Sequence, residues 1–178
     1  MNFNTDNKYG VIYADPPWQF KLRSDKGKDR SPEKHYPVLG LADICRLPVD
    51  TITEDNAVLL MWVCDPMLDQ ALEVINAWGF KYKTVGFTWA KTNRKKLGFF
   101  TGLGYWTRGN PEMCLLATRG KPKRNSKSIP QLVVEQRQEH SRKPDIVYNH
   151  IENMLDGPYV ELFARRKRNN WHSWGNEV

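Results

Sequence analysis

"KYGVIYADPPW", residues 8–18, joins an apolar run to a turn that cannot prolong it. The apolar residues continue to Ala14 without alternating, which is typical of a strand buried on both faces of a parallel sheet. Pro16 and Pro17 carry no backbone N–H and restrict φ, so the strand is expected to end here. Ligands of open α/β sheets lie beyond the carboxyl ends of the strands, which makes Asp15 a candidate site residue.

Four further runs predict strands because they are apolar or rich in β-branched and aromatic residues. They span residues 57–63, 82–91, 112–118 and 159–164. Helical spacing of apolar residues predicts two helices, one between Asp65-Pro66 and Gly79 and one from Lys143-Pro144-Asp145 to Leu155.

Strands that alternate with helices predict an α/β fold with a mainly parallel sheet and helices on both faces. The strands at 82–91 and 112–118 are expected to be antiparallel exceptions, because no crossover helix is apparent between them. The polar, basic stretch 121–142 is expected to form a mobile flap.

Length and composition bound the class of protein. At 178 residues the chain fits a single domain, 1–178, and its 12% aromatic content is too high for a disordered chain. No apolar stretch approaches the roughly 20 residues that cross a bilayer, so we expect a cytoplasmic protein with no membrane partner. The three cysteines are odd in number and widely separated, so neither a disulfide framework nor a metal site is expected.

The chain is basic, with a formal charge of +7 and a pI near 9.3. The excess is clustered at 91–96, 121–127 and 165–168. Any one cluster is typical of a solvated loop, but three clusters interleaved with Trp and Tyr favour nucleic acid as a partner. Residues 94–109 and 121–142 are therefore candidate loops that face the target or form an interface.

The turn after the first strand offers acceptors and an aromatic face. The Asp15 carboxylate and the Pro16 carbonyl can accept from an N–H donor, and the Trp18 ring can stack on a nucleobase at a gain of roughly 1–3 kcal/mol. This combination suits methylation of an exocyclic amine. An ordinary surface turn explains the same four residues equally well.

Motifs along the rest of the chain decide between these alternatives. Together with "ADPPW" they resemble the adenine N6-methyltransferases named for the seventy-kilodalton methyltransferase A subunit of the eukaryotic messenger RNA enzyme. The resemblance covers nearly the whole chain, in the family's order. It is carried by "HY" (35–36), "LLMWV" (59–63), "NAWGF" (76–80), "WAKTN" (89–93), "GYWTRGNPEMCLLATRG" (104–120), "HSRKPD" (140–145), "ELFAR" (161–165) and "WGNE" (174–177).

The resemblance implies transfer of a methyl group from S-adenosylmethionine to N6 of adenine on a Rossmann-like fold. In this permuted type the catalytic motif precedes the cofactor-binding strand. The residues agree, because only fourteen precede Asp15, too few for a βαβ unit that carries a cofactor loop. The cofactor strand is then expected in "YVELFARR", residues 159–166.

The resemblance also implies roles in the catalytic turn. Asp15 and the Pro16 carbonyl would orient the amine, Pro17 would fix the turn, and Trp18 would stack on the adenine. Tyr36 would lie on a loop over the target base.

For the cofactor, the resemblance implies five contacts. Asp15 would lie near the methionyl amino group, and Lys143 would bind the carboxylate with help from a helix start at Pro144. Arg165 and Asn176 would contact the ribose or the adenine. Glu177 stands where the family enzyme has an amide, and its carboxylate would accept from a hydroxyl of the cofactor.

The substrate is expected to be DNA, because short stand-alone relatives resemble prokaryotic or phage DNA modifiers. Methylation of RNA and a catalytically silent nucleic-acid-binding subunit remain alternatives. Because the 94–109 loop lies at a subunit interface in relatives, monomer and homodimer both remain open.

Overall fold

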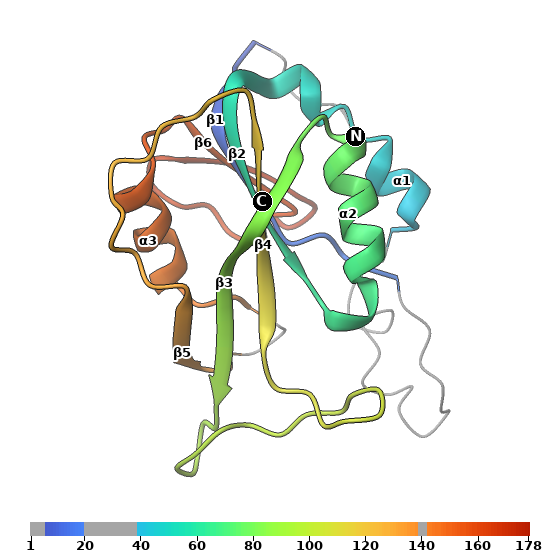
Figure 1. Cartoon of the computed structure of the whole chain (residues 1–178), viewed down its shortest axis with the longest axis vertical. Helices are drawn as coiled ribbons and strands as arrows, with labels where there is room; N and C mark the ends of the chain where they lie inside the picture. Colours follow the sequence, from blue (N-terminus) through green and yellow to red (C-terminus); the bar gives the residue numbers. More distant parts are fainter. Residues whose placement is uncertain (1–5, 20–38, 139–141) are drawn as a thin grey trace.

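A seven-stranded mixed sheet forms the centre of the molecule (Figure 1). The structure is a computed structural model that describes residues 6–19, 39–138 and 142–178. The strand order is β5-β3-β4-β2-β1-β6-β7. Only β4 (Glu112–Arg119) runs against the others, pairing antiparallel with β2 (Thr53–Val63) and β3 (Lys81–Thr92).

β1 (Tyr9–Ala14) lies inside the sheet, parallel to β2 on one side and to β6 (Tyr159–Leu162) on the other. Val11, Ile12 and Ala14 are each at most 1% exposed, as a strand covered on both faces requires. The apolar run therefore places Asp15 at the carboxyl edge of a central strand.

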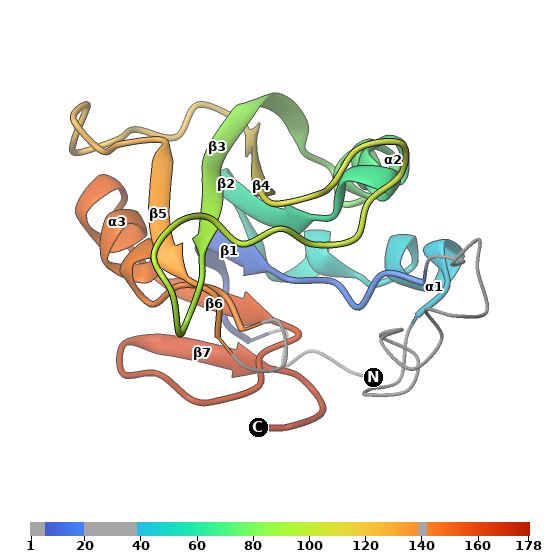
Figure 2. The ribbon, with the colours of Figure 1, turned by 90° about the horizontal axis from the view of Figure 1, so that it is seen from below.

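Helices cover both faces of the sheet (Figure 2). α1 (Leu41–Cys45) and α2 (Leu68–Ala77) lie on one face and α3 (Ile146–Met154) on the other. Successive residues of β2 point to opposite faces, so Met61 packs in the core beneath α2 and Trp62 in the core beneath α3. The expected α/β fold is confirmed, including the antiparallel pairing of β3 with β4.

The predicted helices are present with shifted starts. Two short 3-10 turns, Val49–Ile52 and Asp65–Met67, precede β2 and α2 respectively, so α2 itself begins after the Asp65-Pro66 pair. Gly79, at φ +79°, ends α2 in the left-handed region that glycine occupies without strain. α3 begins at Ile146, after Pro144 and Asp145, rather than at Pro144 as expected.

Both edge strands lie where the sequence predicts none. β5 (Leu132–Gln136) pairs with β3 inside the stretch expected to be a flap, so the 121–142 prediction is wrong for those residues. β7 (Trp171–Trp174) pairs with β6 and brings the C-terminal residues back to the sheet. Of the helices in the described ranges, none is long and apolar enough to cross a membrane.

Candidate active site

The turn after β1 is tied down by its own backbone. The Pro16 carbonyl accepts from the N–H of Trp18 at 2.8 Å, and the Pro17 carbonyl accepts from the N–H of Leu39 at 3.1 Å. A carbonyl oxygen has two lone pairs, so Pro16 retains acceptor capacity. Asp15 is thus held on a closed turn at the sheet edge.

Trp18 anchors this turn to the core. Its indole Nε1 donates to the Trp62 carbonyl at 3.1 Å, and the side chain is only 6% exposed. A base cannot stack on a covered ring, so stacking by Trp18 would require the indole to leave this packing. The stacking role stays a prediction.

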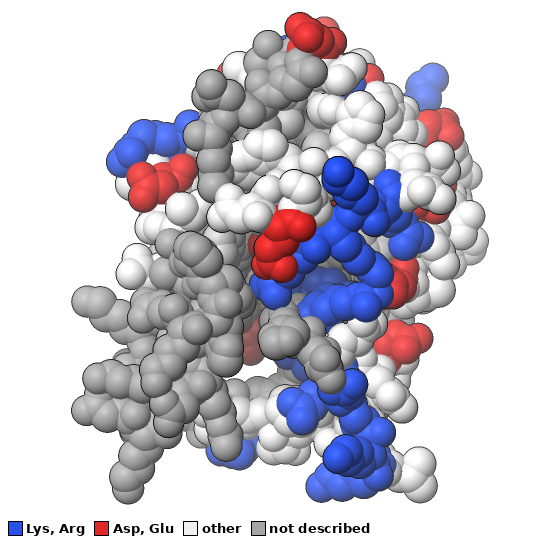
Figure 3. Space-filling view, turned by 180° about the vertical axis from the view of Figure 1, so that it is seen from behind, with Lys and Arg blue, Asp and Glu red and all other residues white. Residues whose placement is uncertain are grey.

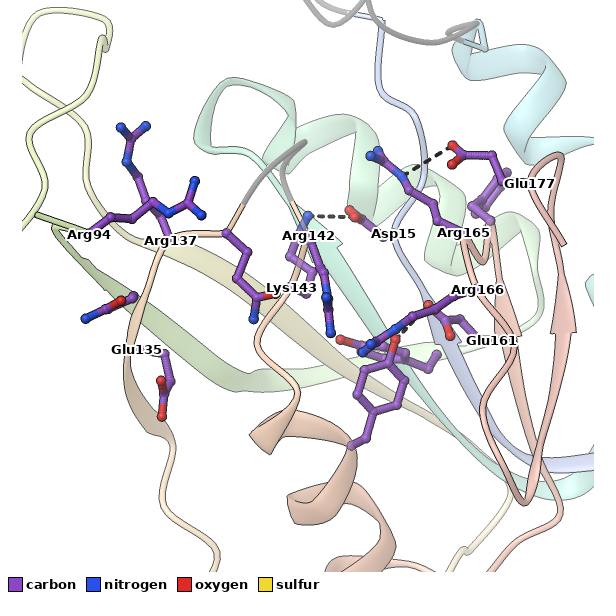
Figure 4. Close-up of a pocket in the computed structure, with 15 residues that line it drawn as sticks. Asp15, Arg94, Glu135, Arg137, Arg142, Lys143, Glu161, Arg165, Arg166 and Glu177 are labelled. Carbon is purple, nitrogen blue, oxygen red and sulfur yellow. Dashed lines mark hydrogen bonds and ion pairs between the residues drawn. The ribbon is translucent and has the colours of Figure 1, made fainter.

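A cavity of about 1020 Å³ opens at the carboxyl edge of the sheet (Figure 4). Small-molecule sites usually enclose about 300–1,000 Å³, so this space suits a nucleoside-sized ligand. Four of the predicted site residues line it: Asp15, Lys143, Arg165 and Glu177.

The other predicted site residues are not among those that line the cavity. Pro16, Pro17 and Trp18 form the turn beside Asp15, and Asn176 is exposed near the end of the chain. Tyr36 lies outside the described residues.

Lys143 joins two carboxylates from different strands. Its Nζ lies 2.6 Å from Asp15 Oδ2 and 3.4 Å from Glu112 Oε2, and Glu112 Oε1 lies 2.6 Å from the Nζ of Lys91. The Lys143 side chain is only 9% exposed. Asp15, Lys143, Glu112 and Lys91 thus form a chain of four alternating charges. Because separating a buried ion pair leaves an uncompensated charge, this chain holds the Asp15 carboxylate in place.

Burial and charge act in opposite directions on the pKa values of this chain. Burial would lower the pKa of Lys143, but Asp15 and Glu112 outweigh it and raise that pKa above its ordinary value. Burial would raise the pKa of Glu112, but Lys143 and Lys91 hold it below its ordinary value. Both groups therefore stay charged at neutral pH.

Glu161 presents a buried carboxylate oxygen to the same cavity. Its Oε1 accepts from the Tyr148 hydroxyl at 2.8 Å, whereas its Oε2 is buried and has no hydrogen-bond partner among the described residues. Burial, with a further contribution from the charge of Asp15, raises the pKa of Glu161 from 4.5 to about 7, although the Tyr148 hydrogen bond opposes it. An unpartnered buried acceptor costs free energy, which a donor on a bound ligand would recover.

Cations outnumber carboxylates around the cavity. Six basic side chains face four acidic ones along its lining, a difference of +2. The acidic residues are Asp15, Glu135, Glu161 and Glu177; the basic ones are Arg94, Arg137, Arg142, Lys143, Arg165 and Arg166. Asp145 pairs with Arg142 at 2.5 Å and also with Arg166, which ties two of the arginines to the start of α3.

The wall between β6 and β7 depends on close backbone packing. Phe163 follows β6 with φ +62°, a strained conformation for a residue with a side chain, and its ring packs edge-on against Trp174 at 5.7 Å. A Cβ on Gly175 would lie 2.1 Å from the Ala164 carbonyl oxygen, so only glycine fits there. This packing brings Glu177 to the cavity, where it lies 3.9 Å from Arg165.

Sequence reasoning missed Glu112 and Glu161. Each is the single carboxylate of an otherwise apolar strand. Because charged side chains are rare in buried strands, their presence in these runs could have marked them as site residues. Within the described ranges, no group of three or more His, Cys, Asp or Glu side chains is arranged to hold a metal ion.

The fold and the cavity define an α/β protein with a Rossmann-like sheet and a cavity beyond the carboxyl ends of its strands. Within this class, the chain belongs to the MT-A70 methyltransferase family, whose sequence model matches residues 9–177. The resemblance inferred from the motifs is thereby confirmed at the level of the family.

Relatives come from bacteria and eukaryotes. The chain is 33% identical to the type II methyltransferase M.MunI of Mycoplasma sp, across 96% of this chain and 78% of that enzyme. It is 28% identical to the N(6)-adenosine-methyltransferase catalytic subunit METTL3 of Homo sapiens, across 96% of this chain but 28% of that protein. A putative N(6)-adenosine-methyltransferase MT-A70-like protein of Medicago truncatula is 31% identical, across 99% of this chain and 28% of that protein. The chain thus spans most of the bacterial enzyme and less than a third of the two eukaryotic proteins.

Proposed function

We propose that the protein transfers the methyl group of S-adenosylmethionine to N6 of adenine in DNA. The observation that carries the proposal is Asp15, which follows β1 at the carboxyl edge, lines the cavity and is paired with the buried Lys143. Membership of the MT-A70 family supports the reaction class.

We prefer DNA to RNA as the substrate because the chain spans a larger share of its bacterial relative than of its human relative. It spans 78% of a bacterial type II methyltransferase, whereas it spans 28% of the human N(6)-adenosine enzyme. The basic loops support either nucleic acid, and methylation of RNA remains the alternative.

The cavity residues fit S-adenosylmethionine, which carries an ammonium group, a carboxylate, a sulfonium and a ribose. The unpartnered Oε2 of Glu161 would accept from a ribose hydroxyl or from the ammonium. Asp15 would also accept from the ammonium, and Lys143 or Arg165 would bind the carboxylate. Glu177, beside Arg165, would accept from a hydroxyl. The bound cofactor would supply the electrophilic methyl group.

The catalytic turn would orient the adenine amine. That amine is a poor nucleophile because its lone pair is delocalised into the ring. The Asp15 carboxylate and the second lone pair of the Pro16 carbonyl would accept hydrogen bonds from its two N–H groups, which would pyramidalise the nitrogen and take its lone pair out of conjugation with the ring. Asp15 would then accept the proton that the methylated nitrogen releases. Pro17 would hold this geometry, and Trp18 would anchor the turn through Trp62.

We propose that residues 1–178 act as one methyltransferase domain, because both cores lie on a single sheet. The 94–109 loop and the 121–142 segment would face the nucleic acid. Arg94, Arg137 and Arg142 support this, because these three residues line the cavity from the two segments. A duplex substrate would require the adenine to be flipped out of the stack.

Incubation with labelled S-adenosylmethionine tests the proposal. Double-stranded DNA, single-stranded DNA and RNA are compared, and digested nucleosides are examined by mass spectrometry. N6-methyladenine in DNA supports the proposal, and N6-methyladenosine in RNA alone moves the substrate to RNA. No methylated base in any substrate, with retained nucleic-acid binding, would favour a catalytically silent binding subunit.

A further inference from the structure

The loop between β3 and β4 carries an unusual set of exposed apolar side chains. Leu97 is 100% exposed, Phe99 63%, Leu103 56% and Trp106 97%. The loop extends past the arrowhead of β3 at the lower end of the molecule (Figure 1). A fully exposed Trp is uncommon, because removing its large apolar ring from water is strongly favourable.

Trp106 is held outward by a tightly closed backbone. Its φ is +64°, and the Gly102 N–H donates to the Gly109 carbonyl at 2.7 Å to close the loop around it. A Cβ on Gly104 would lie 2.3 Å from the Thr107 carbonyl oxygen, so the loop requires glycine at this position. Strained backbone of this kind tends to occur where a side chain must be presented in a fixed direction.

The base of the loop adjoins the cavity. Arg94, near the start of the loop, lines the cavity. Arg137 also lines it, and its guanidinium lies 4.3 Å from the Phe100 ring. Lys and Arg side chains form a band from the middle of the opposite face down to its lower end (Figure 3). A strand of nucleic acid that follows this band from the cavity would reach the loop.

The charge of the loop indicates what covers its apolar tip. Residues 93–110 contain Arg94, Lys95, Lys96 and Arg108 and no Asp or Glu. Pairing this loop with its copy in a second chain would bring eight cations together without a carboxylate, which opposes self-association. A polyanion that also offers flat aromatic surfaces, namely nucleic acid, satisfies both the cations and the indole.

We propose that Trp106 stacks on a nucleobase outside the catalytic cavity, while the cations of the same loop bind the flanking phosphates. In a duplex, the indole would act as a wedge between base pairs near the flipped adenine. The inference rests on the proposed function for its nucleic-acid substrate and adds a second contact point to it.

Binding without cofactor tests this inference separately from methylation. The affinity of mixed-sequence DNA, duplex or single-stranded, is measured by fluorescence anisotropy at several salt concentrations. We expect Trp106→Ala to weaken binding about five- to a hundredfold, the range that stacking on one base supplies. The slope of log affinity against log salt concentration, the salt slope, should not change, because no charge is removed. Trp106→Phe should retain most of the affinity.

Two matched variants separate stacking from other effects. Leu97→Ala removes an equally exposed side chain with no aromatic face and should leave the affinity unchanged. Lys96→Ala should reduce the salt slope by about 0.9 on duplex DNA, the value for one phosphate contact. Bound DNA should also protect Trp106, the most exposed of the seven tryptophans, from acrylamide quenching, a signal that Trp106→Phe removes.

Several results would overturn the inference. One is a Trp106→Ala variant that binds DNA and RNA as the native chain does, or a native chain that binds neither. Another is a shift from dimer to monomer in sedimentation velocity with unchanged affinity per protomer, which would assign the loop to self-association. If the native chain and its variants bind DNA as expected but the native chain forms no N6-methyladenine, the proposed reaction is refuted and the role of Trp106 is left intact.

Discussion

The side chain of Lys143 meets two carboxylates, one just after β1 and one at the start of β4. It lies 2.6 Å from Asp15, after β1, and 3.4 Å from Glu112, at the start of β4. The meeting of Lys143 with Asp15 could be expected from the family motifs. The meeting with Glu112 could not, because it depends on β4 lying next to β2 in the sheet.

Lys143→Ala should affect both cofactor binding and stability. Losing a charge-assisted hydrogen bond to the cofactor carboxylate should weaken S-adenosylmethionine about ten- to a hundredfold by calorimetry. Leaving Asp15 and Glu112 uncompensated should lower the free energy of unfolding by about 3–5 kcal/mol in urea titrations. Lys83→Ala, an exposed lysine on β3, is the matched control. Cofactor affinity equal to that of the native chain would remove Lys143 from the site.

Glu161→Gln should change how stability depends on pH. The buried carboxyl binds its proton more tightly in the folded chain, where its pKa is about 7, than in the unfolded chain, where it is 4.5. The native chain should therefore lose stability relative to the Gln variant as the pH rises from 4.5 to about 7, with no further change above that range. Urea unfolding of both proteins across this range measures the difference. If the free energies of unfolding of the two proteins changed in parallel with pH, the raised pKa of Glu161 would be contradicted.

At the scale of elements, apolar runs and β-branched or aromatic residues predict the inner strands, whereas the short edge strands escape prediction. β1, β2, β3, β4 and β6 lie within a few residues of their predicted ranges. β1 is buried on both faces, whereas the first four residues of β3 are exposed, so its β-branched and aromatic residues mark it instead. β5 and β7 each have one neighbour, and in β5 Leu132 and Val134 remain exposed, so no continuous apolar pattern marks them. α1 has five residues, too few for helical periodicity.

β7 matters for the site because it returns the chain to the cavity, and Gly175 tests this. Gly175→Ala should lower the free energy of unfolding by about 1–3 kcal/mol, because the new methyl group meets backbone atoms that cannot move aside. Cofactor affinity should fall with it, since Glu177 is displaced. Gly40→Ala is the matched control, because a Cβ there has no neighbour nearer than 3.6 Å among the described residues. Equal denaturation midpoints for the two variants would show that this packing is unimportant.

At the scale of the molecule, the charge exceeds what the proposed cofactor needs. S-adenosylmethionine has a net positive charge, so it does not account for a cavity whose basic side chains outnumber the acidic ones six to four. Phosphates of a nucleic acid would account for it, and Lys and Arg side chains continue to the lower end of that face (Figure 3). On the proposed function, one edge of a single sheet would serve both a small cationic cofactor and a large anionic substrate.

The central claim is that Asp15 orients the adenine amine for methylation, and turnover of Asp15→Asn tests it most directly. The native chain, this variant and the control Asp55→Asn, at the opposite edge of the sheet, are incubated with S-adenosylmethionine and duplex DNA, and N6-methyladenine is quantified by mass spectrometry. The amide keeps the shape of the side chain but donates from one of its two terminal atoms, so the rate should fall at least about a hundredfold while circular dichroism shows that the variant is folded. Near-native N6-methyladenine formation by Asp15→Asn would contradict the account.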